Sequence, residues 1–233
     1  MINKISIVIP VAPGEILESE LQKQLLSAPD HWEILICSSQ EPNQSLPSDG
    51  RFRWIKTHGG RANSLNEGAR QATGDYLWFL HADSVLVEGT YMKLAQTAEL
   101  NQAELYYFDL KFIRLSKHNV RPKEIGVLFR CRWLKTPFGD QGFFLKKELF
   151  EANGPYSVEA AYGEDHLFVR KLRRKKIKIT PIGMQLYTSP RKYEQKGWVK
   201  VTILHQYLWI KQAIQDWWQW RSEKNENSNC GLL

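Results

Sequence analysis

The chain has 233 residues, of which 42% are hydrophobic and 12% aromatic, enough to bury the core of one large domain or two small ones. Its formal net charge of +7 favours an anionic partner such as a nucleotide, a nucleic acid or an anionic membrane surface. The three cysteines show no zinc or redox spacing, and no apolar run reaches the roughly 18 residues of a spanning helix, so zinc-finger, disulfide-stabilised and membrane-spanning classes are not expected.

Strands and helices alternate through the first 84 residues. The first apolar run, residues 5–10, is β-branched and too short for the apolar part of a secretion signal, so we expect a strand there. This alternation predicts βαβ units and a mostly parallel sheet with right-handed crossovers, which brings the connecting loops to one edge. The predicted strands cover 5–10, 32–37, 52–56 and 76–80, and the predicted helices cover 16–26 and 62–72.

The rest of the chain continues as a mixture of both elements. Helices are expected over 88–104, 123–135, 147–152 and 164–174, and strands over 105–115, 143–145 and 177–181. A final helix over 197–221 is rich in tryptophan and has lysines nearby. We expect an α/β domain over 1–190 and a C-terminal helical tail over 191–233. The tail either packs on the domain or lies at a membrane surface, and both alternatives stay open.

The segment that follows the strand at 76–80 is the most informative. It reads His81-Ala82-Asp83 and comes at the carboxyl end of a strand that is apolar on both faces. In open α/β sheets, ligands bind outside the carboxyl ends of the strands. A carboxylate there could hold a hard cation that also touches a substrate phosphate. The plain alternative is a polar turn.

Several segments in this order resemble the inverting nucleotide-sugar glycosyltransferases of family 2, which have the Rossmann-like GT-A fold. The resemblance covers roughly residues 4 to 210 and is closest to a bacterial subgroup with HAD in place of the DXD motif. It is carried by SIVIP at 6–10, GGRANSLNEGARQATGDYLWFLHADS at 59–84, FGDQGFFLKKELFEANGPY at 138–156, YGEDHLFVRKLRRKKIKI at 162–179 and SPRKYEQKGW at 189–198.

The resemblance implies a metal-assisted transfer. Asp83 is then the carboxylate linked to a divalent cation, manganese or magnesium, which stabilises the negative charge of the departing diphosphate. His81 occupies the first acidic position of the motif and is expected to have a positional part, because imidazole is a poor magnesium ligand. A capping or packing role is the alternative for His81.

The resemblance also implies a catalytic base. Asp165 is expected to take the proton of the acceptor hydroxyl, with Glu164 orienting it or binding the acceptor. The alternative is that both carboxylates stabilise the N-terminus of a helix.

Donor contacts follow from the same resemblance. Arg61 and Asn66 are expected to face the nucleotide or its diphosphate, since a glycine turn and a helix N-terminus form an anion site. Ser38 stands where many members carry an acidic residue that contacts the base. The further donor-binding residues are expected to be Pro10, Val11, Glu15, Ala82, Gly139, Asp140, Gln141 and Arg191.

The predicted function is therefore glycosyl transfer from a nucleotide sugar, most simply a UDP-sugar, to an unidentified acceptor hydroxyl with inversion. A nucleotidyltransferase, or a non-catalytic basic module that binds membrane or RNA, are the alternatives. We expect a cytoplasmic protein, with peripheral contact at the cytoplasmic face of the membrane and a homodimer left open. Nucleic acid is not an expected partner.

Overall fold

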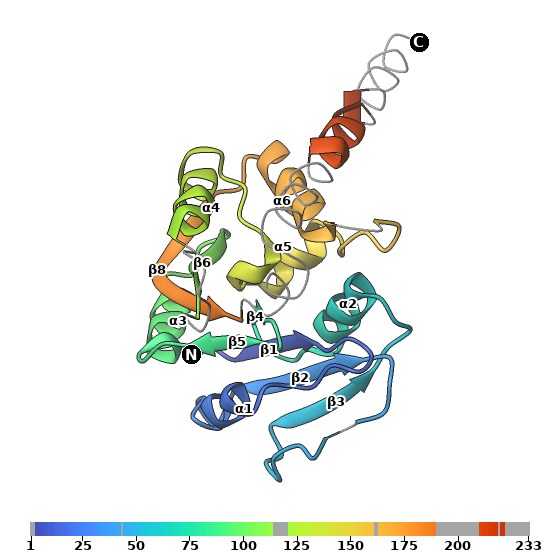
Figure 1. Cartoon of the computed structure of the whole chain (residues 1–233), viewed down its shortest axis with the longest axis vertical. Helices are drawn as coiled ribbons and strands as arrows, with labels where there is room; N and C mark the ends of the chain where they lie inside the picture. The colour runs from blue at the N-terminus through green and yellow to red at the C-terminus, as the bar shows by residue number, and fades with distance from the viewer. Residues whose placement is uncertain are drawn as a thin grey trace.

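The computed structural model describes residues 3–42, 44–113, 121–160, 163–189, 210–218 and 220–221. Strands and helices alternate in its first part, as the sequence predicts, and this part lies at the lower edge of Figure 1. The elements are β1 (Ile5–Pro10), α1 (Ser19–Leu26), β2 (Glu33–Ser38), β3 (Phe52–Lys56), α2 (Arg61–Gln71), β4 (Tyr76–Phe79), β5 (Ser84–Leu86) and α3 (Thr90–Glu99).

The second part completes the sheet and covers one of its faces with helices (Figure 1). It contains β6 (Leu105–Phe112), α4 (Arg121–Trp133), the short 3-10 helix η1 (Gly139–Gln141), β7 (Phe144–Lys146), α5 (Lys147–Ala152), α6 (Glu164–Arg174) and β8 (Ile179–Thr188). Residues 210–218 and 220–221 are helical as well.

One eight-stranded sheet runs through the described residues in the order β3-β2-β1-β4-β7-β6-β8-β5. Strands β1 to β4 pair in parallel, and β6 pairs with β8 in parallel. Strand β7 is antiparallel to both of its neighbours, and β5 is antiparallel to β8. The expected α/β fold with a mostly parallel sheet flanked by helices is confirmed.

The sheet has a hydrophobic core on each of its two faces, and the residues of β1 contribute to both. Ile5, Ile7 and Ile9 point to one face and pack with residues of α1 and α3, whereas Val8 points to the other face and packs with α2 and α6. Successive side chains of a strand alternate between faces, so a strand with apolar side chains on both faces must be covered on both sides. This double cover holds the carboxyl ends of β1 and β4 rigidly.

Some boundaries differ from the predicted ones. Helix α1 begins at Ser19 and not at residue 16, because Glu18 has extended backbone angles. Leu17, which the prediction placed in the helix, is buried but precedes it. Strand β8 continues to Thr188, seven residues beyond the prediction, since it pairs with β6 and then with the unpredicted β5. A short segment read by itself cannot reveal a strand that depends on such long-range pairing.

The C-terminal helical residues contact α6 through Asp216 and through Trp220, whose ring centroid lies 5.2 Å from the guanidinium carbon of Arg174. Asp216 receives hydrogen bonds from Arg174 and lies 3.6 Å from a guanidinium nitrogen of Arg170. The predicted domain boundary near residue 190 and the tail between 190 and 209 lie outside the described residues. None of the described helices has the length and apolar character needed to cross a membrane.

Candidate active site

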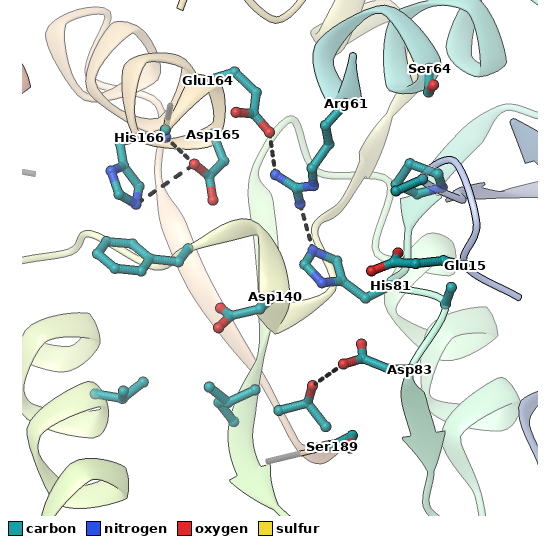
Figure 2. A pocket seen from close by; sticks show the side chains of 18 of the residues that line it. Glu15, Arg61, Ser64, His81, Asp83, Asp140, Glu164, Asp165, His166 and Ser189 are labelled. Carbon is teal, nitrogen blue, oxygen red and sulfur yellow. Dashed lines mark hydrogen bonds and ion pairs between the residues drawn. The ribbon is translucent and has the colours of Figure 1, made fainter. Parts of the chain in front are cut away.

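A cavity of about 990 Å³ opens at the carboxyl ends of β1 and β4. The loops after these two strands, the N-termini of α2 and α6, and one side of α4 form its walls. Figure 2 shows carboxylates, an arginine and two histidines directed into it. Its polar lining consists of Glu15, Ser39, Arg61, Ser64, His81, Asp83, Lys123, Arg130, Asp140, Glu164, Asp165, His166, Thr188 and Ser189.

Arg61 joins three parts of the chain at the centre of the cavity. It is the first residue of α2 and follows Gly59 and Gly60, whose φ angles of 85° and 81° favour glycine. One guanidinium nitrogen donates to Glu164 at the start of α6, and the other lies 2.5 Å from His81 Nε2 (Figure 2). Because arginine only donates hydrogen bonds, His81 Nε2 must accept, and the His81 proton is therefore on Nδ1.

The N-terminus of α2 also suits an anion. Gly60, Arg61 and Ser64 line the cavity, and no side chain caps the first turn of this helix. Backbone N–H groups and the positive end of the helix dipole therefore face the cavity beside a fixed guanidinium. This wall is suited to a phosphate group.

Asp165 is held ionised at the start of α6. Its Oδ2 accepts a hydrogen bond from the backbone N–H of Gly139, and its Oδ1 accepts one of 2.9 Å from the N–H of His166. Burial works to raise the pKa of Asp165, but His166, the Arg61 guanidinium and the two N–H donors together hold it below its usual value. Each carboxylate oxygen keeps a further lone pair with which to accept a proton.

His166 lies beside this carboxylate, with Nε2 3.6 Å from Asp165 Oδ1. Burial lowers the pKa of His166 against the attraction of Asp165, so the imidazole is neutral near pH 7. Arg61 and the two backbone N–H donors act on Asp165 whatever the protonation state of this ring.

Asp83 lies across the cavity from Asp165, in the loop after β4 (Figure 2). Thr188, at the end of β8, places its hydroxyl 3.3 Å from Asp83 Oδ2. Among the described residues, no three histidine, cysteine or acidic side chains gather closely enough to hold a metal ion by themselves. A carboxylate beside a hydroxyl is nevertheless the hard-oxygen set that suits magnesium or manganese when substrate phosphates supply the other ligands. The residues fit a cation that is shared with a diphosphate.

Two cavity residues that the motifs did not indicate, Lys123 and Arg130, belong to α4. Phe138, the first residue of the 138–156 segment, lies beside them, with its ring 3.1 Å from the guanidinium carbon of Arg130. Burial lowers the pKa of Lys123 to about 7, although Asp140 opposes this shift. Burial also raises the pKa of Asp140, whose Oδ1 has no hydrogen-bond partner in the described part of the chain. No sequence signal connects these residues, because α4 reaches the cavity through tertiary packing.

The predicted site residues divide into three groups. Those that line the cavity are Pro10, Val11, Glu15, Arg61, His81, Ala82, Asp83, Asp140, Glu164 and Asp165. Arg191 lies outside the described residues. Those that do not line the cavity are Ser38, Asn66, Gly139 and Gln141.

The members of this last group have internal roles. Asn66 exchanges two 2.9 Å hydrogen bonds with the backbone of Tyr156, and the amide of Gln141 bonds to Phe108, Phe138 and Arg130. Ser38 is buried at the end of β2. Gly139 supports the site from behind, through its N–H to Asp165. These residues shape the walls of the cavity and do not contact its interior.

Comparison with known proteins gives a family and a set of similar folds. The model of the family described as Glycosyl transferase family 2 matches residues 15–158, which include Asp83 and end before Asp165. No curated protein sequence matches the chain. The solved structure of S. aureus TarS residues 1–349 superposes with a TM-score of 0.64 at 16% identity, covering 82% of this chain and 62% of that one.

Two further structures contain ligands. TarS 1–349 in complex with UDP-GlcNAc has a TM-score of 0.63 at 16% identity and covers 80% of this chain and 58% of its own. GalNAc-T7 with UDP, GalNAc and Mn²⁺ has a TM-score of 0.60 at 15% identity, with 81% and 44% covered. The chain thus spans less than two thirds of the length of these proteins, and the likeness concerns the fold.

Proposed function

The chain belongs to glycosyl transferase family 2, and from this premise we propose that it transfers a sugar from a nucleotide-diphosphate donor to an acceptor hydroxyl with inversion. One observation carries the proposal. The cavity at the carboxyl ends of β1 and β4 has a wall suited to a phosphate group and an ionised, buried carboxylate that face one space. A transfer between a diphosphate donor and a hydroxyl needs both.

The donor end is assigned to the loops after β1 and β4 and to the first turn of α2. Glu15, Arg61 and Asp83 line this end. Arg61 and the N–H groups of α2 would face the diphosphate, and Asp83 with Thr188 would hold a magnesium or manganese ion there. When bound, such an ion neutralises charge on the leaving diphosphate. A UDP-sugar is the proposed donor, supported by the UDP-GlcNAc complex of the similar TarS structure.

The transfer itself is a single displacement. The acceptor oxygen forms a bond to the anomeric carbon from the face opposite the diphosphate, and the bond from that carbon to the phosphate oxygen breaks. Asp165 takes the proton of the acceptor hydroxyl, and the electron pair leaves on the nucleoside diphosphate. Glu164 keeps Arg61 in place through their ion pair and so positions the donor wall. Attack from the opposite face inverts the anomeric configuration.

Donor binding tests the first half of the proposal. Titration calorimetry with UDP, GDP and CDP, each with and without Mn²⁺, should show tight binding of one nucleotide when the metal is present. Asp83→Asn should remove the effect of the metal. Asp30→Asn is the matched control, because the Asp30 side chain is fully exposed and does not line the cavity. Equal nucleotide binding by Asp83→Asn and the native protein would exclude Asp83 as the metal ligand.

The stereochemistry tests the second half. Water can replace the acceptor, and proton NMR can then identify the anomer of the released sugar before it equilibrates. An α-linked UDP-sugar should give the β-anomer first. Initial release of the α-anomer would contradict inversion and with it the role of Asp165 as the base.

The proposed setting is the cytoplasm, with peripheral contact at a membrane. The C-terminal helix exposes Trp217 and Trp218, which suit either a membrane interface or a second copy of the chain. Light scattering after size exclusion, with and without the Trp217→Ser/Trp218→Ser double substitution, distinguishes the two. A dimer that becomes a monomer in the variant would assign the tail to self-association.

A further inference from the structure

Helix α4 has an apolar outer face that nothing in the described structure covers. Trp133 is 75% exposed, Ile125 66% and Phe129 56%, and Leu128 and Leu134 are also exposed. The rings of Phe129 and Trp133 stack on each other one turn apart, with centroids separated by 5.8 Å. Large side chains at positions 125, 128, 129 and 133 share one side of a helix. Exposed apolar patches of this kind mark interaction sites.

Basic residues flank this face. Arg121 and Arg132 belong to the same side of the helix by spacing, with Arg132 paired to Asp109 at 2.8 Å, and Lys135 lies two residues after the helix. Of the five basic side chains in residues 121–135, Lys123 and Arg130 line the cavity on the opposite side, and the single acidic residue, Glu124, is buried. Tryptophan and phenylalanine flanked by arginine and lysine match the boundary of an anionic lipid layer, where rings enter the interface and cations meet headgroups. The positive charge beside the apolar face of α4 does not favour a basic protein as the partner.

The opposite side of α4 forms part of the cavity wall. Lys123, Gly126, Val127 and Arg130 line the cavity from this side. Leu134 both lines the cavity and is 46% exposed, so the rim of the cavity meets the apolar face there. Leu110, Phe112 and Phe138 make this end of the cavity apolar, with Lys123 and Arg130 as its cations. One helix thus connects an amphipathic outer surface with one end of the cavity.

We propose that α4 docks on an anionic lipid surface through Ile125, Phe129 and Trp133 and presents the α4 end of the cavity to that surface. The docking does not depend on the proposed function. The consequence of docking for the reaction does rest on the proposed function. If sugar is transferred, the acceptor enters the cavity from the lipid surface, and an anionic amphiphile fits the lining of the α4 end of the cavity. The partner is a bilayer with negative headgroups, recognised by inserted rings and by arginine and lysine.

Vesicle co-sedimentation of the full chain tests the proposal. The probes are vesicles of phosphatidylcholine alone and of phosphatidylcholine mixed with phosphatidylglycerol. The native protein should bind the anionic vesicles, bind the neutral ones weakly, and lose affinity as salt is raised. Phe129→Ser/Trp133→Ser should reduce binding to the anionic vesicles by about tenfold or more, because both inserted rings are lost.

Matched variants make the result specific. Met92→Ser/Leu100→Ser removes comparable exposed apolar area at α3 and should bind within about twofold of the native protein. Trp217→Ser/Trp218→Ser reports on the tail. Thermal unfolding of each variant confirms that it is folded, and UDP binding measured on the same samples keeps a failure of the proposed function separate from a failure of docking.

Three outcomes would overturn the proposal. The first is unchanged vesicle binding by the folded α4 variant, and the second is loss of binding in the tail variant alone. The third is a native protein that binds no vesicle. If that protein forms a dimer that the α4 substitutions dissociate, the apolar face of α4 binds a second copy of the chain instead.

Discussion

Arg61 and His81 lie 2.5 Å apart between guanidinium Nη2 and imidazole Nε2, and this contact links the start of α2 to the loop after β4. The same guanidinium holds Glu164 at the start of α6. Three segments separated by up to 103 residues are therefore fixed relative to one another by one side chain. Burial works to lower the pKa of Arg61, but Glu164 and Asp165 outweigh it and raise the pKa, so the charge of Arg61 is permanent.

Removing this link should weaken both fold and site. Arg61→Ala leaves the Glu164 carboxylate buried without its cation and should lower the free energy of unfolding by about 2 kcal/mol, less than a fully buried pair because a third of the Arg61 side chain is exposed. Arg70→Ala breaks an exposed pair with Glu67 and should cost much less, because water and salt screen exposed charges. Urea denaturation measures both, and equal losses would refute a central role for Arg61.

Asp165→Asn should lower kcat by roughly 10²- to 10⁴-fold and leave nucleotide binding unchanged, since a base acts on the acceptor and not on the donor. Because the pKa of Asp165 is below its usual value of 3.8, activity should not fall through this group until the pH drops below that value. A pH profile of kcat/KM on the native enzyme checks this.

The control for this prediction is Glu164→Gln, measured in the same assay. It should raise the KM for the donor more than it lowers kcat, because Glu164 positions Arg61. A variant Asp165→Asn with native kcat would remove Asp165 from the mechanism. Circular dichroism should precede the kinetics, since the new amide faces a backbone N–H.

Gly139 lies against both Arg61 and Asp165 and leaves room for their side chains. A Cβ atom at this position would lie 2.7 Å from Arg61 Nη2 and 2.9 Å from Asp165 Oδ2. Gly139→Ala should therefore displace the guanidinium from His81 and reduce kcat by about 10- to 100-fold, because small misplacements of catalytic groups are costly. Gly50→Ala meets nothing within 4 Å and should be neutral. Native activity in Gly139→Ala would mean that Arg61 adjusts without consequence.

Lys123 should make stability depend on pH. Burial lowers its pKa to about 7, against about 10.5 in the unfolded chain, so the unfolded state binds more protons between these values. The stability contributed by this group should rise as pH increases from 7 towards 10. Lys123→Met should remove that rise, and the difference between native and variant should change by up to about 2 kcal/mol between pH 7 and 9. A constant difference across this range would contradict the lowered pKa.

Local pattern determined a large part of the fold. The apolar runs that became β1 and β4 and the helical spacing of α5 and α6 are visible in the chain, because burial on both faces of a strand and on one face of a helix imposes its own period. The position of Asp83 at the end of β4 and of Asp165 at the start of α6 follows from the same boundaries. Their roles remain proposals that rest on the family resemblance.

The remaining features of the fold and of the cavity were decided by tertiary structure, because they depend on contacts between residues far apart in sequence. Asn66 lies in the predicted motif, yet its amide bonds to the backbone of Tyr156, 90 residues away, and turns from the cavity. Strand β5 exists through its pairing with β8. Lys123 and Arg130 reach the cavity because α4 packs over β6. Periodicity reports which side of an element is buried, whereas the identity of the opposing surface is set by how the elements pack.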